Sequence, residues 1–206
     1  MLEAADLECE RGGRRIFRGL SFTLAPGELL RVAGANGSGK TSLLRMLCGL
    51  LAPSRGEVRW GGTAIGRLRE DYSKQLVYLG HAPAVKDDLT AGENLSISCS
   101  LSGIPWTEKA VRAALEHLGL GGKQHEPVRR LSQGQRRRSA LARLCLAEAV
   151  PLWLLDEPFS ALDAAGVGLL RALIDAHVRR GAMVAFTTHQ DPGIEAARVI
   201  ELGLAL

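Results

Sequence analysis

The sequence predicts an α/β domain built on a mainly parallel sheet, and three observations support that fold class. Short apolar runs typical of buried strands alternate with helix-like segments along much of the chain. Glycine accounts for 24 of the 206 residues, which suits frequent tight turns between such elements. Aromatic residues make up only 4%, fewer than the strands of an all-β sandwich usually contain. A chain of this length can bury its own core, so we expect one domain over residues 1–206.

The first half of the chain is predicted to consist of strands separated by tight turns. These strands cover residues 20–24, 28–33, 56–60 and 75–80. A helix is expected from residue 40 to about residue 50, because four leucines, the last of them Leu50, fall on one helical stripe. We therefore expect an N-terminal antiparallel β part and the start of a parallel sheet.

The second half becomes helical and loop-rich from about residue 89 to residue 149. Thr107 is expected to cap a helix that Gly119 ends, and a second helix is expected over residues 134–149. Strand and helix then alternate again, with strands at residues 150–155, 183–187 and 199–202 and a helix at residues 165–180. The pattern predicts a helical subdomain, residues 89–149, inserted into the sheet domain.

The composition excludes several classes of protein. We expect no transmembrane helix and no signal peptide, because the chain has no long apolar run and its N-terminus is acidic. The four cysteines stand far apart without a CxxC pair, so we expect neither a zinc site nor a disulfide framework. The net charge of +4 is small, and a solvated surface explains it as well as an anionic partner does.

Residues 34–41 match the phosphate-binding loop pattern G-x-x-x-x-G-K-[ST], and we call this segment the P-loop. The match lies directly after a predicted strand and directly before a predicted helix, where backbone N–H groups can surround a phosphate. Lys40 would neutralise the β- and γ-phosphates, and the Thr41 hydroxyl would hold Mg²⁺. The candidate ATP-binding residues here are Gly34, Ala35, Asn36, Gly37, Ser38, Gly39, Lys40, Thr41 and Ser42.

Two adjacent carboxylates, Asp156 and Glu157, follow the apolar strand predicted at residues 150–155. Asp156 is placed to hold Mg²⁺, and Glu157 is placed to act as general base toward an attacking water. An ordinary solvated Asp-Glu pair is the alternative, and the P-loop earlier in the chain makes it the weaker one.

Two further segments give weaker signals on their own. Residues 131–135, Leu-Ser-Gln-Gly-Gln, offer a hydroxyl and N–H groups at a helix start, although a simple helix cap explains them equally well. His189 follows the strand at residues 183–187, where its imidazole could contact the γ-phosphate. A lone histidine at such a place more often has no function.

The order of these motifs resembles that of ATP-binding subunits of ABC transporters over nearly the whole chain. The resemblance implies a P-loop NTPase fold and a dimer of two copies that encloses two ATP molecules. It implies that His189 is the switch histidine and that Ser160 to Asp163 form the D-loop at the dimer interface, with Ser160 and Asp163 as its site residues. It also implies a signature segment that contacts the other copy's ATP, formed by Leu131, Ser132, Gln133, Gly134 and Gln135.

Two departures from the family pattern help to place the chain within it. His81 stands where most members have glutamine, so we expect it near the Mg²⁺. The aromatic residue that usually stacks on adenine falls near Arg11, with Phe17 close by, and the Arg11 guanidinium could stack on the base instead. With the short length and the run of arginines at residues 136–138, these features are similar to the ATPase subunits of the cytochrome c maturation, or heme export, system.

This resemblance implies Mg²⁺ as cofactor with ATP as substrate, a separate integral membrane permease, and a peripheral location at the cytoplasmic face of the bacterial inner membrane. Two alternatives remain. The first is an ATPase subunit for an exporter of different cargo. The second is a soluble ABC-type ATPase of translation or DNA maintenance, but such proteins carry fused ATPase domains or long coiled coils.

We expect no nucleic-acid partner, and we assign the basic residues Arg136, Arg137, Arg138 and Arg143 to a solvated or interface face. No chemical role is assigned to His177.

Overall fold

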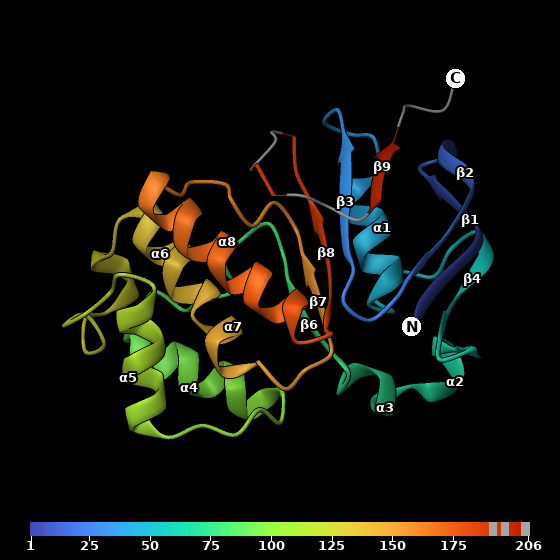
Figure 1. The fold of residues 1–206 in the computed structure, drawn as a ribbon. Coiled ribbons are helices and arrows are strands. Elements are labelled where there is room, and N and C mark those ends of the chain that lie inside the picture. Colours follow the sequence, from blue (N-terminus) through green and yellow to red (C-terminus); the bar gives the residue numbers. More distant parts are fainter. Residues whose placement is uncertain (190–192, 195–197, 203–206) are drawn as a thin grey trace. The chain divides into compact units, whose positions relative to one another are not determined.

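The computed structural model describes residues 1–189, 193–194 and 198–202. It divides the chain into two compact units, which are considered separately (Figure 1). The first unit comprises residues 1–81, 150–158 and 177–206, and the second comprises residues 82–149 and 159–176. The second unit contains the predicted helical segment of residues 89–149. The assignment of residues 1–206 to one domain stays a prediction.

An antiparallel sheet with the strand order β2-β1-β4-β5 forms the N-terminal part of the first unit, as predicted. Its strands are β1 (Leu2–Arg11), β2 (Arg14–Leu24), β4 (Arg55–Trp60) and β5 (Thr63–Ala64). Gly12 and Gly13 join β1 to β2 with φ values of 57° and 73°, which a tight hairpin turn of this kind requires. The sequence analysis did not identify β1.

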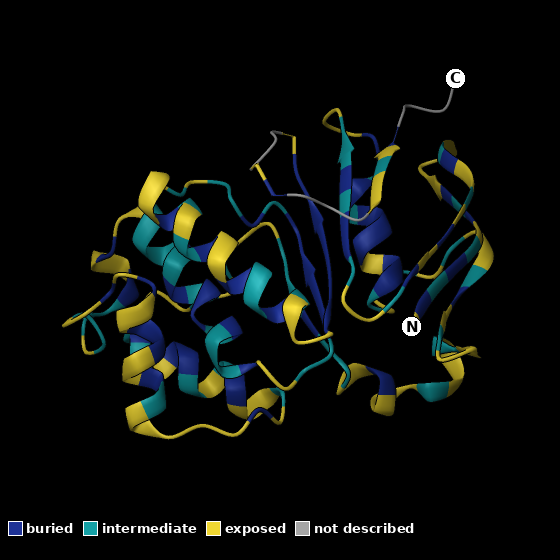
Figure 2. Cartoon of the chain, viewed as in Figure 1, coloured by how far each residue is buried: buried dark blue, intermediate teal, exposed yellow. Residues whose placement is uncertain are grey.

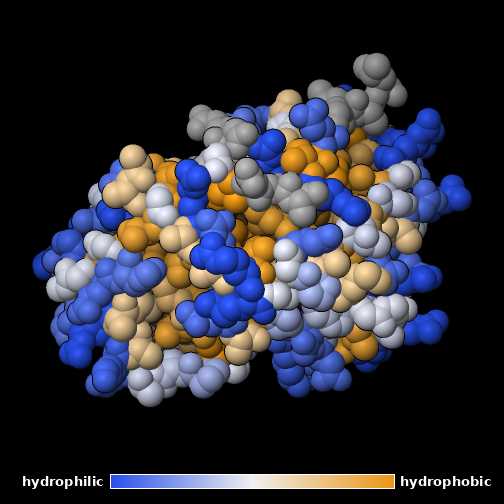
Figure 3. Space-filling view, viewed as in Figure 1, coloured by the Kyte–Doolittle hydropathy of each residue, from blue (hydrophilic) through white to orange (hydrophobic). Residues whose placement is uncertain are grey.

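The exposed residues of this antiparallel sheet are mostly charged, and Figure 3 shows hydrophilic side chains projecting from its edge. Several of these charges form ion pairs, namely Arg15–Glu8, Arg55–Asp6 and Arg59–Glu57. Exposed pairs of this kind contribute little to stability. They do show how a basic chain distributes much of its charge over a solvated face.

The second sheet of the first unit has the strand order β6-β7-β8-β3-β9, and every neighbouring pair in it is parallel. Its strands are β3 (Leu29–Gly34), β6 (Leu76–Leu79), β7 (Leu152–Leu155), β8 (Met183–Thr187) and β9 (Arg198–Leu202). Each corresponds to a predicted strand. The strands β7 and β8 are buried along their whole length (Figure 2). All five strands therefore end at one edge, called here the carboxyl edge.

Helix α1 (Lys40–Leu47) lies between the two sheets of the first unit (Figure 1). Leu43, Leu44 and Leu47 are fully buried against leucines of both sheets, and each such burial contributes about 1.5–3 kcal/mol. The prediction that Leu50 shares this stripe is wrong, because Leu50 is 69% exposed. The helix ends at Leu47, and Gly49 (φ 78°) then turns the chain so that the Leu50 N–H donates back to the Arg45 carbonyl at 2.8 Å.

The second unit is helical in its described part. Its elements are α4 (Ala91–Leu101), α5 (Glu108–His117), the 3₁₀ turn Val128–Arg130, α6 (Gln133–Leu141), α7 (Arg143–Leu146) and most of α8 (Ala164–Arg179). Two short helices, α2 (Ile65–Leu68) and α3 (Glu70–Ser73), belong to the first unit. No helix within the described ranges is long and apolar enough to cross a membrane.

Caps define the helix starts in the second unit. Thr107 caps α5 as predicted, since its hydroxyl accepts a hydrogen bond from the Ala110 N–H. Thr90 caps α4 in a reciprocal bond with Glu93 that the sequence analysis did not identify. The single helix predicted at residues 134–149 is wrong. The Cys145 N–H donates to the Ala142 carbonyl, three residues back, and this tight turn divides the segment into α6 and α7.

Of the two alternatives predicted for the arginines of α6 and α7, a solvated face is wrong for Arg137 and Arg143, and an interface role stays a prediction. Arg137 is 4% exposed, and Arg136 donates to Asp87 and to the Leu131 carbonyl. Arg143 donates to the Ser102 hydroxyl, and burial lowers its pKa. Arg136 and Arg143 therefore connect separate segments of the second unit through hydrogen bonds.

His177, in the last turn of α8, is fully buried and stacks on Trp153 of β7. The ring centroids are 3.6 Å apart and the planes differ by 9°. Burial lowers the pKa of His177 to about 4, and nearby Arg180 acts in the same direction. The imidazole is therefore a neutral packing group near pH 7.

The depressed pKa of His177 predicts acid sensitivity. In the unfolded chain His177 takes up a proton below about pH 6.5, whereas in the folded chain it does so only below about pH 4. The free energy of unfolding should therefore decrease by up to about 3 kcal/mol across this window. His177→Phe, which keeps a stacking ring, should lose less stability than wild type between pH 7 and pH 4.5 in chemical denaturation. His117→Phe, at an exposed position, is the matched control. Equal pH profiles for all three chains would contradict the assignment.

Candidate active site

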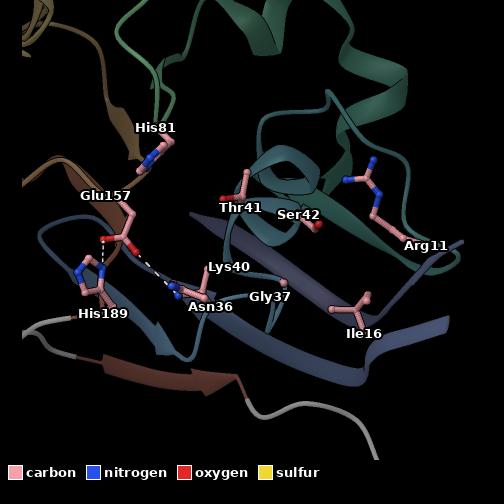
Figure 4. Close-up of a pocket in the computed structure, with 11 residues that line it drawn as sticks. Arg11, Ile16, Asn36, Gly37, Lys40, Thr41, Ser42, His81, Glu157 and His189 are labelled. Carbon is pink, nitrogen blue, oxygen red and sulfur yellow. Dashed lines mark hydrogen bonds and ion pairs between the residues drawn. The ribbon is translucent and has the colours of Figure 1, made fainter. Parts of the chain in front are cut away.

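A cavity of about 530 Å³ opens in the first unit at the carboxyl edge of the parallel sheet (Figure 4). It is lined by Arg11, Ile16, Asn36, Gly37, Gly39, Lys40, Thr41, Ser42, His81, Glu157 and His189. The strand order explains this gathering. The P-loop follows β3, His81 lies beyond the end of β6, Glu157 follows β7 and His189 follows β8. Segments that are far apart in the sequence therefore meet at one edge.

The P-loop places the start of α1 at the cavity. Gly39 has a φ of 97°, and a Cβ atom there would lie 2.6 Å from Ile16 Cγ2, so a larger residue would not fit. No side chain caps α1, and its first turn contains no acidic residue. The N–H groups of that turn are thus left for an anion, which the helix dipole also favours.

Lys40 is held inside the P-loop by backbone carbonyls. Its Nζ donates to the carbonyl oxygens of Gly34 at 2.7 Å and Ala35 at 3.1 Å. The same amine lies 3.8 Å from Glu157 Oε1, and its side chain is only 8% exposed. Ser38 is buried beside it at 1% exposure. The cation is therefore fixed at the cavity, where a polyphosphate would need it.

Thr41 and Asp156 form a pair of hard oxygen donors. The Thr41 hydroxyl lies 2.9 Å from Asp156 Oδ2 and 3.2 Å from Oδ1, and Asp156 is 1% exposed. Asp156 reaches the cavity through Thr41 rather than lining it. Oxygen donors of this kind suit Mg²⁺. No group of three His, Cys, Asp or Glu residues in the described ranges could hold a metal alone, so water or ligand oxygens would have to complete the site.

Glu157 and His189 lie together on one side of the cavity (Figure 4). His189 Nδ1 is 3.0 Å from Glu157 Oε2, while the other carboxylate oxygen faces Lys40. Glu157 has a φ of 48°, in the left-handed region that a non-glycine residue rarely adopts. This backbone turn carries the carboxylate from the end of β7 into the cavity, where it can accept a proton from water.

Arg11 and Ile16 lie at the opposite side of the cavity from Glu157 (Figure 4). Phe17 cannot replace the aromatic residue that usually stacks on adenine, because it is 6% exposed and packs in the core. Ile16 was not among the predicted site residues. Its place in the alternating strand β2, next to buried Phe17, was the signal that its side chain points the other way. His81 is exposed and lines the cavity on the Glu157 side.

The remaining predicted residues belong to the second unit and not to this cavity. Leu131 is buried at 5% exposure, and Ser132 caps α6 by accepting from the Gln135 N–H at 3.2 Å. As an acceptor in this bond, the hydroxyl keeps its proton for donation to a ligand. Asp163 Oδ1 accepts from the Gly166 N–H at 2.9 Å, so this carboxylate caps the start of α8. Their roles toward another copy stay predictions.

Comparison with known proteins gives a consistent result. A family model described as "ABC transporter" matches residues 17–160. The cytochrome c biogenesis ATP-binding export protein CcmA of Nitrosospira multiformis is 52% identical over 203 residues, covering 98% of each chain. The protein of the same name from Nitrosomonas europaea is 51% identical over 205 residues, covering 100% of this chain and 96% of its own. A solved dimeric bacterial ABC transporter cassette shares the fold, with a TM-score of 0.82 at 23% identity over 98% of this chain and 94% of its own.

Lys40→Ala should weaken ATP binding by roughly ten- to a hundredfold, because charge-assisted hydrogen bonds contribute about 1.5–3 kcal/mol each. Titration with a fluorescent ATP analogue measures the effect. Lys74→Ala, an exposed lysine on the surface of the first unit, should bind like wild type. Unchanged affinity in Lys40→Ala would refute the assignment of this cavity to phosphates.

Proposed function

The chain belongs to the ABC transporter family, and we propose that it is the ATP-hydrolysing subunit of a membrane export complex that serves cytochrome c biogenesis. One observation carries the enzymatic part: Lys40, the Thr41–Asp156 pair and the Glu157–His189 pair meet at one cavity beside an uncapped helix start. The pathway is supported by the printed name of relatives that are 51–52% identical over nearly the whole chain.

The P-loop holds the triphosphate of ATP in this proposal. Backbone N–H groups at the start of α1 donate to phosphate oxygens, and the Lys40 amine neutralises the β- and γ-phosphates. Thr41 and Asp156 hold Mg²⁺, which when bound neutralises charge that develops on the phosphate oxygens. Arg11 and Ile16 face the adenine, with the planar guanidinium in place of a ring.

Glu157 is the general base. Its carboxylate accepts a proton from water as the water oxygen bonds to the γ-phosphorus and the bond from that phosphorus to the β–γ bridging oxygen breaks. ADP and phosphate are the products. His189 orients the carboxylate and contacts the γ-phosphate. His81 lies on the same side of the cavity. There one nitrogen of a neutral imidazole can accept a hydrogen bond from water near the Mg²⁺, as a glutamine oxygen would.

A second copy of the chain completes each site. The donors Ser132 and Gly134 reach the ATP held by the other copy's P-loop, and Ser160 and Asp163 lie at the interface. Ser132 is exposed at the start of α6, whose first turn has no acidic residue, and this supports the role. A separate integral membrane permease is the further partner, and the chain acts peripherally at the cytoplasmic face of the bacterial inner membrane. The word "export" in the relatives' name supports that partner.

Glu157→Gln should keep ATP binding and lose hydrolysis by a factor on the order of 10²–10⁴, because the amide cannot accept the proton of water. Phosphate release and nucleotide titration measure the two quantities separately. The variant should also accumulate as a dimer with ATP and not with ADP in size-exclusion chromatography. Glu70→Gln, exposed on α3, is the control and should behave like wild type. Near-normal turnover in Glu157→Gln would exclude Glu157 as the base.

The proposed pathway has its own test. A bacterium whose own ATPase subunit for cytochrome c biogenesis is deleted should regain c-type cytochromes when it expresses this chain. It should not regain them with Glu157→Gln. Covalently bound heme, stained on a denaturing gel, is the readout. If the purified chain hydrolyses ATP normally but the strain does not regain c-type cytochromes, an exporter of different cargo would be favoured.

A further inference from the structure

Thr187 occupies an unusual place at the carboxyl end of β8, between β7 and β3. It is fully buried, with 0% exposure. Its Oγ1 lies 2.7 Å from Asp156 Oδ1, and the Glu157 N–H donates to the same Oγ1 at 2.8 Å. One hydroxyl thus contacts both residues of the Asp-Glu pair.

The two contacts fix the direction of each hydrogen bond. A backbone N–H can only donate, so Thr187 Oγ1 is the acceptor toward Glu157. Its own proton is then given to the Asp156 carboxylate, which can only accept when ionised. Because Asp156 Oδ2 is the nearer partner of the Thr41 hydroxyl, at 2.9 Å, the two carboxylate oxygens are bound from β8 and from α1. The carboxylate plane cannot rotate without breaking one of these bonds.

The bond to the Glu157 N–H acts on the backbone. Glu157 adopts a φ of 48°, and a non-glycine residue keeps such a conformation only where surrounding contacts hold it. The Thr187 hydroxyl is one such contact. It lies on a strand with no exposed residue, so its position is rigid. A valine in its place would fill the same volume and make neither bond.

We propose that Thr187 is a positioning residue for ATP hydrolysis, which orients the Asp156 carboxylate toward Mg²⁺ and holds the Glu157 backbone so that its carboxylate faces the attacking water. This inference rests on the proposed ATPase function. It adds a residue that touches neither nucleotide nor metal and acts through Asp156, which would hold the metal, and Glu157, which faces the water.

Three variants test the inference. Thr187→Val removes both hydrogen bonds at nearly constant volume, and Thr187→Ser keeps the hydroxyl. Val184→Ala, elsewhere on β8 and fully buried, opens a cavity without touching the Asp-Glu pair. Thermal unfolding places the three on one stability scale, so that loss of fold can be told from loss of positioning.

Thr187→Val should lower kcat on the order of 10- to 100-fold, the factor that a lost hydrogen bond to a charged group gives, and raise the KM for ATP by no more than about tenfold. Thr187→Ser should recover kcat to within about threefold of wild type. Val184→Ala should lower the unfolding temperature and leave kcat within about twofold. Equal kcat in Thr187→Val and Val184→Ala would overturn the inference, because it would make Thr187 a packing residue only.

A binding measurement tests the metal side without turnover. Titration with a fluorescent ATP analogue, with Mg²⁺ and then with EDTA, gives the gain in affinity that Mg²⁺ confers. Thr187→Val should reduce this gain by about three- to tenfold and leave affinity in EDTA unchanged. Thr187→Ser should show the wild-type gain. An unreduced gain in Thr187→Val would overturn the orientation of Asp156 by Thr187.

The outcomes separate this inference from the proposed function. If wild type and Glu157→Gln hydrolyse ATP equally, the proposed base fails, and the Mg²⁺-dependent binding still decides the role of Thr187. If Glu157→Gln is inactive and Thr187→Val equals wild type in both assays, the ATPase proposal stands and only the positioning role fails.

Discussion

The first unit depends on one buried carboxylate, Asp156, at 1% exposure. A buried charge is tolerated only when hydrogen bonds replace its lost hydration, and here the replacements come from different elements. Thr41 contacts it from α1 and Thr187 from β8, while its own backbone N–H donates to the Leu79 carbonyl at the end of β6. Strand β7 therefore cannot be placed without the P-loop helix and both neighbouring strands. The group that assembles this edge of the sheet is also the one that the proposed chemistry requires.

Helix starts divide into two kinds in this chain. Those of α4, α5 and α6 are closed by the side chains of Thr90, Thr107 and Ser132. The start of α1 has no side-chain cap, and glycine precedes it. An uncapped start leaves backbone donors unsatisfied, which destabilises an isolated helix. Burial of the α1 leucines between the two sheets offsets that loss, so the donors remain available at the cavity.

Most strands and the main residues of the cavity can be predicted from local sequence patterns, because these patterns do not depend on tertiary contacts. An apolar run followed by a glycine-rich loop predicts both a strand and a phosphate site, and the structure places Lys40, Thr41 and Glu157 together. What the sequence could not predict depends on tertiary contacts. Nothing local distinguishes Arg137 from a surface arginine, yet it is only 4% exposed. Likewise, the role of Thr187 depends on which strand becomes the neighbour of β7, and local periodicity says nothing of strand order.

The contact between Lys40 and Glu157 makes nucleotide entry an exchange of counterions. The Lys40 amine lies 3.8 Å from a Glu157 carboxylate oxygen, so a phosphate that contacts this amine replaces one ionic partner by another. The free energy of binding is then a difference between two ionic interactions, and dissolved salt screens both of them. In the proposed ATPase, the affinity for ATP is accordingly less sensitive to ionic strength than a count of phosphate charges implies.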